Sequence, residues 1–181
     1  MEQIGDAYSS KNHTIMTTLE IIRHNDILFR DLLRAVAVKN VAWPHPVESQ
    51  VKWIIDNMQP DDMHVFLKEN GKDKAYLTLS PVTATLNGVA TPFMGVGCVC
   101  AAERGIGLGY LLLESVNKWL VEHNHKGLLF CKQGLLKFYS KNGWRVIEPA
   151  NVFFETEHTG VYTMSYNCEE IKRIQYSDRL F

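Results

Sequence analysis

Three closely spaced glycines, Gly105, Gly107 and Gly109, constrain this sequence more than any other feature. An expected strand precedes them, and apolar residues at helical spacing predict a helix over residues 108–124. Glycine lets a loop turn tightly and brings backbone N–H groups close to a ligand. The first turn of a helix adds unpaired N–H donors and a dipole that favours negative charge. The loop is therefore a candidate site for a phosphate or pyrophosphate, and Arg104 adds a cation beside it.

The even spacing of these glycines differs from two familiar nucleotide-binding loops. The dinucleotide fingerprint reads G-x-G-x-x-G, but Tyr110 and Leu112 stand where its last glycine would fall. A P-loop needs Gly-Lys followed by Ser or Thr, which this loop lacks. The spacing therefore disfavours a flavin or nicotinamide oxidoreductase. A glycine turn without a ligand is the structural alternative, but the flanking strand, the helix and Arg104 favour an anion site.

Hydrophobic periodicity predicts a mixed α/β chain. The expected strands cover residues 17–23, 64–68, 74–79, 82–86, 89–100, 128–131, 144–147 and 161–166, and the expected helices cover 25–39, 46–58, 108–124 and 134–142. Asn25 and Asp26 offer capping oxygens to the first helix, and Pro46 suits the first position of the second. Asn87-Gly88 is a strong hairpin signal. The order indicates a mixed sheet and excludes the strict alternation of a doubly wound fold.

Length and composition fit one folded domain. The 181 residues are 46% hydrophobic and 22% charged, which suffices for a substantial core. We expect a short polar N-terminal segment over residues 1–16 and a single domain over residues 17–181. A net charge of −1 argues against a general nucleic-acid binder, and no apolar run is long enough to span a bilayer. Four cysteines without metal-ligand spacing predict no metal site and favour a reducing, cytoplasmic compartment; they are Cys98, Cys100, Cys131 and Cys168.

The glycine loop resembles the acyl-CoA-binding motif of the GCN5-related N-acetyltransferase (GNAT) superfamily, Arg/Gln-x-x-Gly-x-Gly/Ala, in which Arg104, Gly107 and Gly109 fill the motif positions. Residues 138–144, Phe-Tyr-Ser-Lys-Asn-Gly-Trp, are similar to the F-Y-x-K-x-G-F/W stretch after the family's fifth strand. Ala101 departs from the pattern, because many members have proline there. The resemblance implies the GNAT acyl-CoA N-acyltransferase fold, with a mostly antiparallel, splayed central sheet flanked by helices.

The resemblance also implies how acetyl-CoA would bind as a co-substrate. Pantetheine would lie between the splayed strands and bond to the main chain near Cys98, Val99 and Cys100. The pyrophosphate would lie on the loop and the start of the following helix. The implied cofactor-binding residues there are Arg104, Gly105, Ile106, Gly107, Leu108, Gly109 and Tyr110. Most of them would act through backbone groups.

Tyr139 is the candidate catalytic residue, because it occupies the family's tyrosine position near the cofactor sulfur. A phenol is protonated at neutral pH and can donate its proton to a leaving thiolate. Packing of the short helix on the sheet is the structural alternative. A main-chain N–H near Val99 would polarise the thioester carbonyl, as the family suggests. A covalent route through Cys98 or Cys100 is a further alternative, although no histidine adjoins them in sequence.

The general base and the acceptor remain open at this level. No carboxylate or histidine lies between residues 94 and 102, and Glu103 is expected to be a solvated charge beside the loop. Candidate bases acting through water are Asp61, Asp62, Glu155, Glu157 and His158. Trp43, His45 and Trp53 are candidates to line an acceptor pocket, with core or rim packing as the alternative.

The resulting hypothesis is an N-acetyltransferase that transfers acetyl from acetyl-CoA to a primary amine of a small molecule by direct attack. Residues 128–145 look most like the small-molecule branch, including aminoglycoside 2′-N-acetyltransferase-like members. The alternatives are a peptide or protein N-acetyltransferase and a non-catalytic CoA-binding regulatory domain of the same fold. The expected partners are a small amine and, because family members often pair, a second copy of the chain; no nucleic acid or membrane is expected.

Overall fold

The computed structural model describes residues 2–10, 13–155 and 160–181. It divides into two compact units. Unit 1 contains the chain up to Leu79 together with Cys98–Leu112, and unit 2 contains Ser80–Gly97 and Leu113–Phe181.

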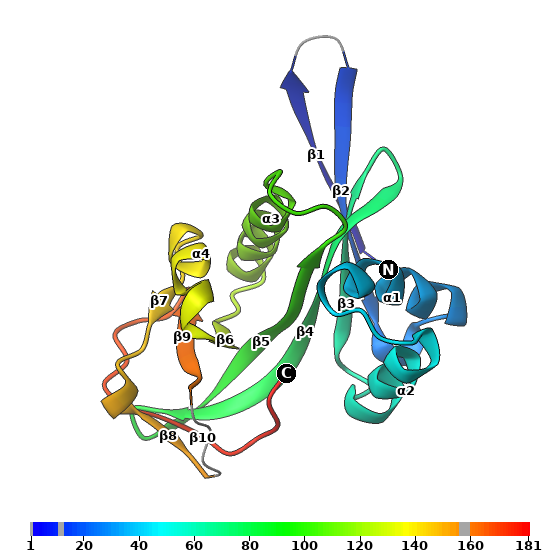
Figure 1. Cartoon of the computed structure of the whole chain (residues 1–181). Coiled ribbons are helices and arrows are strands. Elements are labelled where there is room, and N and C mark those ends of the chain that lie inside the picture. The colour runs from blue at the N-terminus through cyan, green and yellow to red at the C-terminus, as the bar shows by residue number, and fades with distance from the viewer. Residues whose placement is uncertain (1, 11–12, 156–159) are drawn as a thin grey trace. The chain divides into compact units, whose positions relative to one another are not determined.

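The strands form an open mixed sheet flanked by helices, with the hydrogen-bonded order β1-β2-β3-β4-β5-β6-β9-β7 and with β10 beside β4 and β8 (Figure 1). The strands are β1 (Glu2–Ser10), β2 (His13–Arg23), β3 (Met63–Glu69), β4 (Lys72–Leu86), β5 (Val89–Ala101), β6 (Gly127–Cys131), β7 (Arg145–Val146), β8 (Val152–Phe154), β9 (Tyr162–Tyr166) and β10 (Ile174–Tyr176). The helices are η1 (His24–Asp26), α1 (Phe29–Ala42), α2 (Val47–Asn57), α3 (Leu108–Glu122), η2 (Gln133–Leu135), α4 (Leu136–Lys141) and η3 (Pro149–Asn151). The predicted mixed α/β class is confirmed.

The direction of pairing changes along the sheet. In unit 1, β1, β2, β3 and β4 pair as antiparallel neighbours. In unit 2, β5 pairs with β6 in parallel, and β9 pairs antiparallel with both β6 and β7. A parallel pair needs a crossover connection, and α3 lies in the segment between β5 and β6.

Two apolar clusters hold unit 1 together. The first joins α1 to the strands and contains Ile22, Ala35, Val38, Phe66, Tyr76 and Cys100. The second joins α1 to α2 and contains Leu32, Val36, Ile54 and Met58. Leu32, Ala35 and Val36 recur at helical spacing, so one stripe of α1 serves both clusters.

A partly buried charge cluster lies at the start of α1 in unit 1. The Arg34 guanidinium forms ion pairs with Glu20, Asp31 and Asp73, and Lys68 pairs with Glu20 at 2.8 Å. Burial alone would raise the pKa of Glu20, but the hydrogen bonds from Lys68 and Arg34 outweigh it and lower that pKa. The cluster therefore favours the ionised form of Glu20 and ties α1 to the strands.

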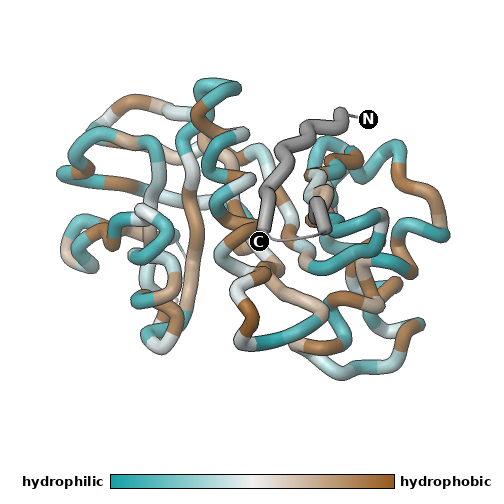
Figure 2. The backbone as a smooth tube through the Cα atoms, turned by 90° about the horizontal axis from the view of Figure 1, so that it is seen from above, coloured by the Kyte–Doolittle hydropathy of each residue, from teal (hydrophilic) through white to brown (hydrophobic). Residues whose placement is uncertain are grey.

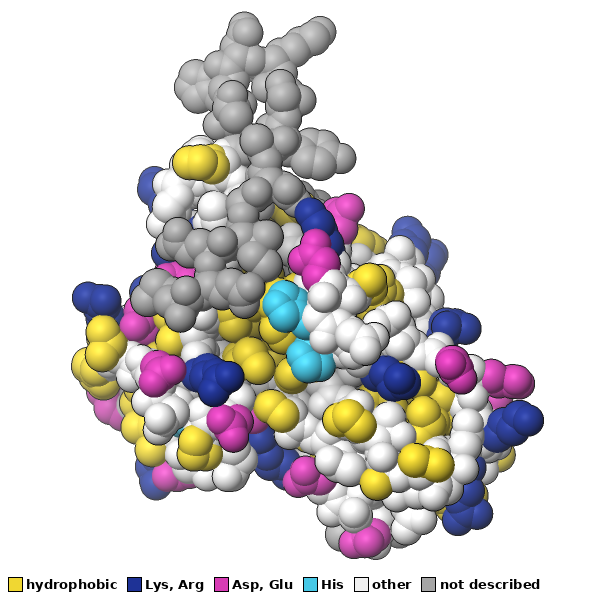
Figure 3. Space-filling model, turned by 180° about the vertical axis from the view of Figure 1, so that it is seen from behind, with side chains coloured by type: hydrophobic (Ala, Val, Ile, Leu, Met, Phe, Trp, Pro, Cys, Tyr) yellow, Lys and Arg dark blue, Asp and Glu magenta, His cyan; other side chains and the backbone are white. Residues whose placement is uncertain are grey.

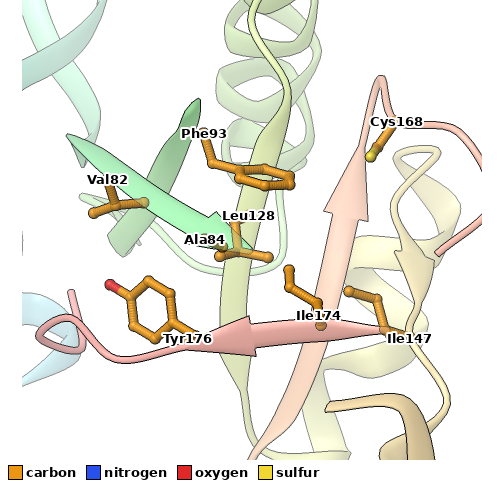
Figure 4. Packing of buried hydrophobic residues seen from close by; sticks show 8 residues of the cluster. All are labelled: Val82, Ala84, Phe93, Leu128, Ile147, Cys168, Ile174 and Tyr176. Atoms are coloured by element: carbon orange, nitrogen blue, oxygen red, sulfur yellow. The ribbon is translucent and has the colours of Figure 1, made fainter. Parts of the chain in front are cut away.

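The core of unit 2 lies between its strands and the C-terminal segment. Figure 4 shows its eight buried members, which are Val82, Ala84, Phe93, Leu128, Ile147, Cys168, Ile174 and Tyr176. Trp144 is also buried, and its Nε1–H donates to Asn117 Oδ1 at 3.0 Å. A Cβ on Gly127 would lie 2.6 Å from the Trp144 ring, so this contact requires glycine.

Some predicted boundaries were wrong. Asn25 and Asp26 were expected to cap the first helix, but α1 begins at Phe29, where Asp31 Oδ2 accepts the Leu28 N–H at 3.4 Å. The first predicted strand starts at His13 instead of residue 17, and β1 precedes it within the segment expected to be a polar lead-in. The predicted strands 74–79 and 82–86 are one strand, β4.

The Asn87-Gly88 hairpin is confirmed. Both residues have left-handed backbone angles, φ 49° and 89°, as a type I′ turn requires. The Asn87 side chain reinforces the turn, because its Oδ1 accepts the N–H groups of Lys172 and Arg173, each at 3.0 Å.

Apolar and hydrophilic residues alternate in short stretches along this chain, and charges of opposite sign lie close together on the surface. Figure 2 shows short apolar stretches alternating with hydrophilic ones, and no helix in the described part of the chain is long and apolar enough to cross a membrane. On the face drawn in Figure 3, Lys and Arg side chains are interspersed with Asp and Glu, so that face carries no continuous field of one sign.

Candidate active site

Strand β5 contains a left-handed residue. Cys98 has φ 51°, although it is not glycine and stands inside a strand. This conformation is costly for a residue with a Cβ, and such strain concentrates at functional sites. The irregularity falls on the segment for which the sequence predicts main-chain contacts with pantetheine.

The glycine loop follows β5 within unit 1 and leads into α3. Gly105 and Gly107 have φ 81° and 89°, and a Cβ at either position would meet no protein atom within 4 Å. The N–H groups of Tyr110 and Leu111 donate to Gly107 O, whereas helix geometry leaves those of Leu108 and Gly109 without an intrahelical acceptor. The loop therefore combines free backbone donors with open space beside them.

Arg104, which was expected to contact a phosphate, forms hydrogen bonds with the end of α1. Its Nη2 donates to the carbonyl of Val41 at 3.0 Å and contacts that of Ala42 at 3.5 Å, so it holds the loop against the end of α1. A phosphate contact from its remaining N–H groups stays a prediction. Glu103 is paired with Lys74 at 3.0 Å, which compensates the negative charge beside the loop.

These features fit a pyrophosphate such as that of CoA. Its oxygens need several donors and close approach of backbone, and the loop provides N–H groups at a helix N-terminus with no Cβ at Gly105 or Gly107. The loop is exposed, while the buried Leu108 side chain anchors the start of the helix.

A cavity of about 470 Å³ lies between α1, α2 and β5 in unit 1. Its lining comprises Lys39, Trp43, His45, Ser49, Gln50, Trp53 and Cys98. The prediction that Trp43, His45 and Trp53 line one pocket is confirmed; that it holds an acceptor stays a prediction. The cavity reaches the left-handed residue of β5, so the strained strand forms part of its wall.

Gln50 fixes the loop between α1 and α2. Its side-chain Nε2 lies within hydrogen-bond distance of Asn40 Oδ1 (3.0 Å), His45 O (3.2 Å) and Trp43 O (3.3 Å). Asn40 Oδ1 also accepts the His45 N–H at 3.1 Å. These hydrogen bonds fix the backbone at Trp43 and His45, which line the cavity.

The two cysteines of β5 have different surroundings. Cys98 is half-buried on the cavity wall, whereas Cys100 is buried, with its Sγ 3.6 Å from Tyr76 O. Burial, followed by the neighbouring Cys98, raises the pKa of the Cys100 thiol to about 12. The raised pKa disfavours the reactive thiolate, which argues against Cys100 as the nucleophile of the covalent alternative.

A hydrogen-bonded chain of three rings, in which His64 and Tyr76 are buried and His24 is half-buried, was missed at the sequence level. His24 Nδ1 lies 3.0 Å from His64 Nε2, and His64 Nδ1 lies 2.7 Å from the Tyr76 hydroxyl. Burial is the main reason that the pKa of His64 falls to about 3, helped by the positive charges of His24 and Lys39. Burial also lowers the pKa of His24 and raises that of Tyr76. No local motif marks this chain, because its members meet through the pairing of β3 with both β2 and β4.

Tyr139 lies in unit 2, on α4. It is buried, and its ring meets that of Trp144 edge-on at 6.4 Å between centroids. Its carbonyl accepts the N–H groups of Asn142 and Trp144, which closes α4 ahead of the left-handed Gly143. The ring therefore has a packing role, and the catalytic role of its hydroxyl stays a prediction.

Neither of the predicted bases in unit 1, Asp61 and Asp62, lines the cavity. Asp61 is exposed, with Arg23 3.9 Å away, and the buried Asp62 accepts the Gln59 N–H at 2.8 Å. Glu155 is exposed in unit 2. Glu157 and His158 lie outside the described residues.

Comparison with known proteins identifies the fold. No family model and no curated protein matches the sequence. Among solved structures, an acyl-CoA N-acyltransferase from Pseudomonas aeruginosa is similar, with TM-score 0.57, 19% identity and coverage of 83% of this chain and 99% of that one. The GNAT family N-acetyltransferase YhbS from Escherichia coli, in complex with CoA, has TM-score 0.63, 13% identity and 93% coverage of both chains.

The ribosomal-protein-S18-alanine N-acetyltransferase from Escherichia coli is also similar, with TM-score 0.55, 17% identity and coverage of 82% of this chain and 92% of that one. The predicted GNAT acyl-CoA N-acyltransferase fold is thereby confirmed. Identities this low establish the fold alone, and the aminoglycoside-like branch stays a prediction.

Proposed function

We propose that this protein is an acetyl-CoA-dependent N-acetyltransferase that acetylates the primary amine of a small molecule. One observation carries the proposal. The glycine loop, which offers N–H donors at the start of α3, directly follows β5, and Cys98 of β5 is left-handed and lines a cavity. In unit 1 the proposed anion site for the cofactor therefore follows directly on β5, which forms part of the wall of the cavity proposed for the acceptor. The shared fold with acyl-CoA N-acyltransferases supports the same reading.

Acetyl-CoA, when bound, supplies an acyl group activated as a thioester. The N–H groups of Leu108 and Gly109 are the proposed donors to its pyrophosphate, and the main chain of Cys98, Val99 and Cys100 is the proposed partner of its pantetheine. A Val99 N–H directed at the thioester oxygen would stabilise the negative charge that develops there during attack.

Two proton transfers accompany the exchange of the C–S bond for a C–N bond. The amine loses a proton, and His45, an imidazole on the cavity wall, is the proposed acceptor. The departing thiolate gains a proton, and the Tyr139 hydroxyl is the proposed donor. The acceptor attacks directly, so no acyl-enzyme forms.

Calorimetric titration with acetyl-CoA tests the cofactor, with NAD and FAD as controls. We expect selective binding of acetyl-CoA and its loss in Gly107→Glu, because a carboxylate would occupy the anion site. Gly71→Glu is the matched control: Gly71 also has a positive φ, 77°, and open space beside it, but it lies in the β3–β4 turn. Equal affinity of both variants for acetyl-CoA would refute the assignment of the loop.

Turnover separates an enzyme from a non-catalytic CoA-binding domain of the same fold. We expect Tyr139→Phe to lower thiol release far more than acetyl-CoA affinity. Tyr166→Phe is the control, because the Tyr166 ring also packs on Trp144, at 5.5 Å, but has no proposed chemical role. Unchanged turnover in Tyr139→Phe would exclude the phenol as the acid, and acetylation of peptides but not small amines would exclude the proposed acceptor class.

A further inference from the structure

Lys39 is the most unusual side chain of the cavity in unit 1. It is only 7% exposed and lines the cavity, and its ammonium lies 4.5 Å from the centre of the Trp53 ring. This cation–π contact holds the charge in place but supplies no counter-ion. A buried ammonium without an anionic partner is unfavourable.

Three other lysines of unit 1 have such partners. Lys52, Lys68 and Lys74 form ion pairs with carboxylates at 2.6, 2.8 and 3.0 Å. Among residues 16–155 and 160–181, whose side chains the structure describes, no carboxylate pairs with Lys39. Lys39 is thus a buried cation on the wall of a cavity whose lining contains no carboxylate.

The rest of the lining combines two indoles and Cys98 with the polar side chains of His45, Ser49 and Gln50. Trp43 and Trp53, 42% and 45% exposed, present indole surface to the cavity. Gln50 is 5% exposed, and the hydrogen bonds of its Nε2 to the α1–α2 loop fix the orientation of its amide. Among the residues whose side chains the structure describes, none donates a hydrogen bond to its Oε1, so that oxygen is an acceptor available to an amine N–H.

We propose that the acceptor is an amino acid with a large apolar side chain, bound with its carboxylate on Lys39. Gln50 Oε1 receives the amine N–H, and the side chain lies against the indoles of Trp43 and Trp53. The inference rests on the proposed function, because it takes this cavity as the acceptor's site. A polycationic aminoglycoside would face a buried cation and no carboxylate in the lining, which argues against that branch.

Binding of matched acids and amides tests the role of Lys39. Calorimetry would compare L-phenylalanine, L-tyrosine, L-tryptophan and L-leucine with their carboxamides, which keep the amine and side chain but lack the negative charge. We expect at least one acid to bind the wild-type protein about ten-fold more tightly than its amide, the size of a charge-assisted hydrogen bond. No acid exceeding its amide would overturn the proposal.

Variants assign the preference to one side chain. Lys39→Met keeps the length but removes the charge and should abolish the preference for acids, whereas Lys39→Arg should retain it. Lys74→Met is the control, because Lys74 pairs with Glu103 and does not line the cavity. A preference that survives in a folded Lys39→Met protein would also overturn the proposal; if that variant fails to fold, the wild-type comparison decides.

The same titrations distinguish this inference from the proposed function. Acid-selective binding without acetyl-CoA binding or thiol release would refute the acetyltransferase and leave the carboxylate site standing. Acetylation of amines and amides as readily as of amino acids would support the enzyme and refute the carboxylate site.

Discussion

Acidification from about pH 7.5 to pH 5 is expected to destabilise this protein chiefly through His64. The ring is fully buried between His24 and the Tyr76 hydroxyl, and its pKa falls from 6.5 to about 3, mainly because of burial. A depressed folded-state pKa means that the unfolded chain binds the proton more readily. This contribution to stability is therefore complete above pH 6.5 and is lost as the pH falls towards 3.

The size of the effect follows from the two pKa values. At pH 5 an unfolded histidine favours its protonated form about 30-fold, while folded His64 remains almost wholly neutral. The difference corresponds to about 2 kcal/mol of unfolding free energy, a large share of the ~5–15 kcal/mol typical of a domain. The lowered pKa of His24 adds a loss of the same sign.

Urea unfolding across this pH range measures the loss. His64→Gln should lower stability at neutral pH but flatten its decline with acid, because the titrating ring is gone. Tyr76→Phe is the matched control: it removes the same 2.7 Å hydrogen bond but keeps the buried imidazole, so the steep decline should persist. Equal pH dependence in the wild-type protein and His64→Gln would refute the assignment.

Three further substitutions test packing and charge. Gly127→Ala should cost about 1–3 kcal/mol, because its Cβ would lie 2.6 Å from the Trp144 ring, whereas Gly134→Ala, with no atom within 4 Å, should cost far less in urea unfolding. Asn117→Leu leaves Trp144 Nε1 without its acceptor and should lower stability by about 1–3 kcal/mol; an unchanged Tm would contradict this. Arg34→Met should cost about 3 kcal/mol at neutral pH, and the loss should shrink in acid as Glu20, whose pKa is lowered in this cluster, becomes protonated; a pH-independent loss measured by denaturation would point to lost packing.

Local patterns predicted the elements whose causes are local. The type I′ turn at Asn87-Gly88 and the left-handed Gly107 before α3 both follow from backbone freedom at short range. The glycine that ends α4, Gly143, is of the same kind. Local patterns failed at the start of α1. Asn25 and Asp26 were predicted to cap this helix, but Asp26 ends a 3₁₀ turn and the helix begins at Phe29.

The sequence by itself determined the mixed α/β class, the glycine loop and the aromatic residues of a pocket, because each depends on residue type and spacing along one segment. Only the tertiary structure decided which distant groups meet. The hydrogen bonds that link His24, His64 and Tyr76 depend on strand register. The separation of Lys39 from every described carboxylate depends on how α1 and α2 pack. Burial and pairing of charges are properties of such non-local contacts, so the chemistry of the cavity emerged only with the fold.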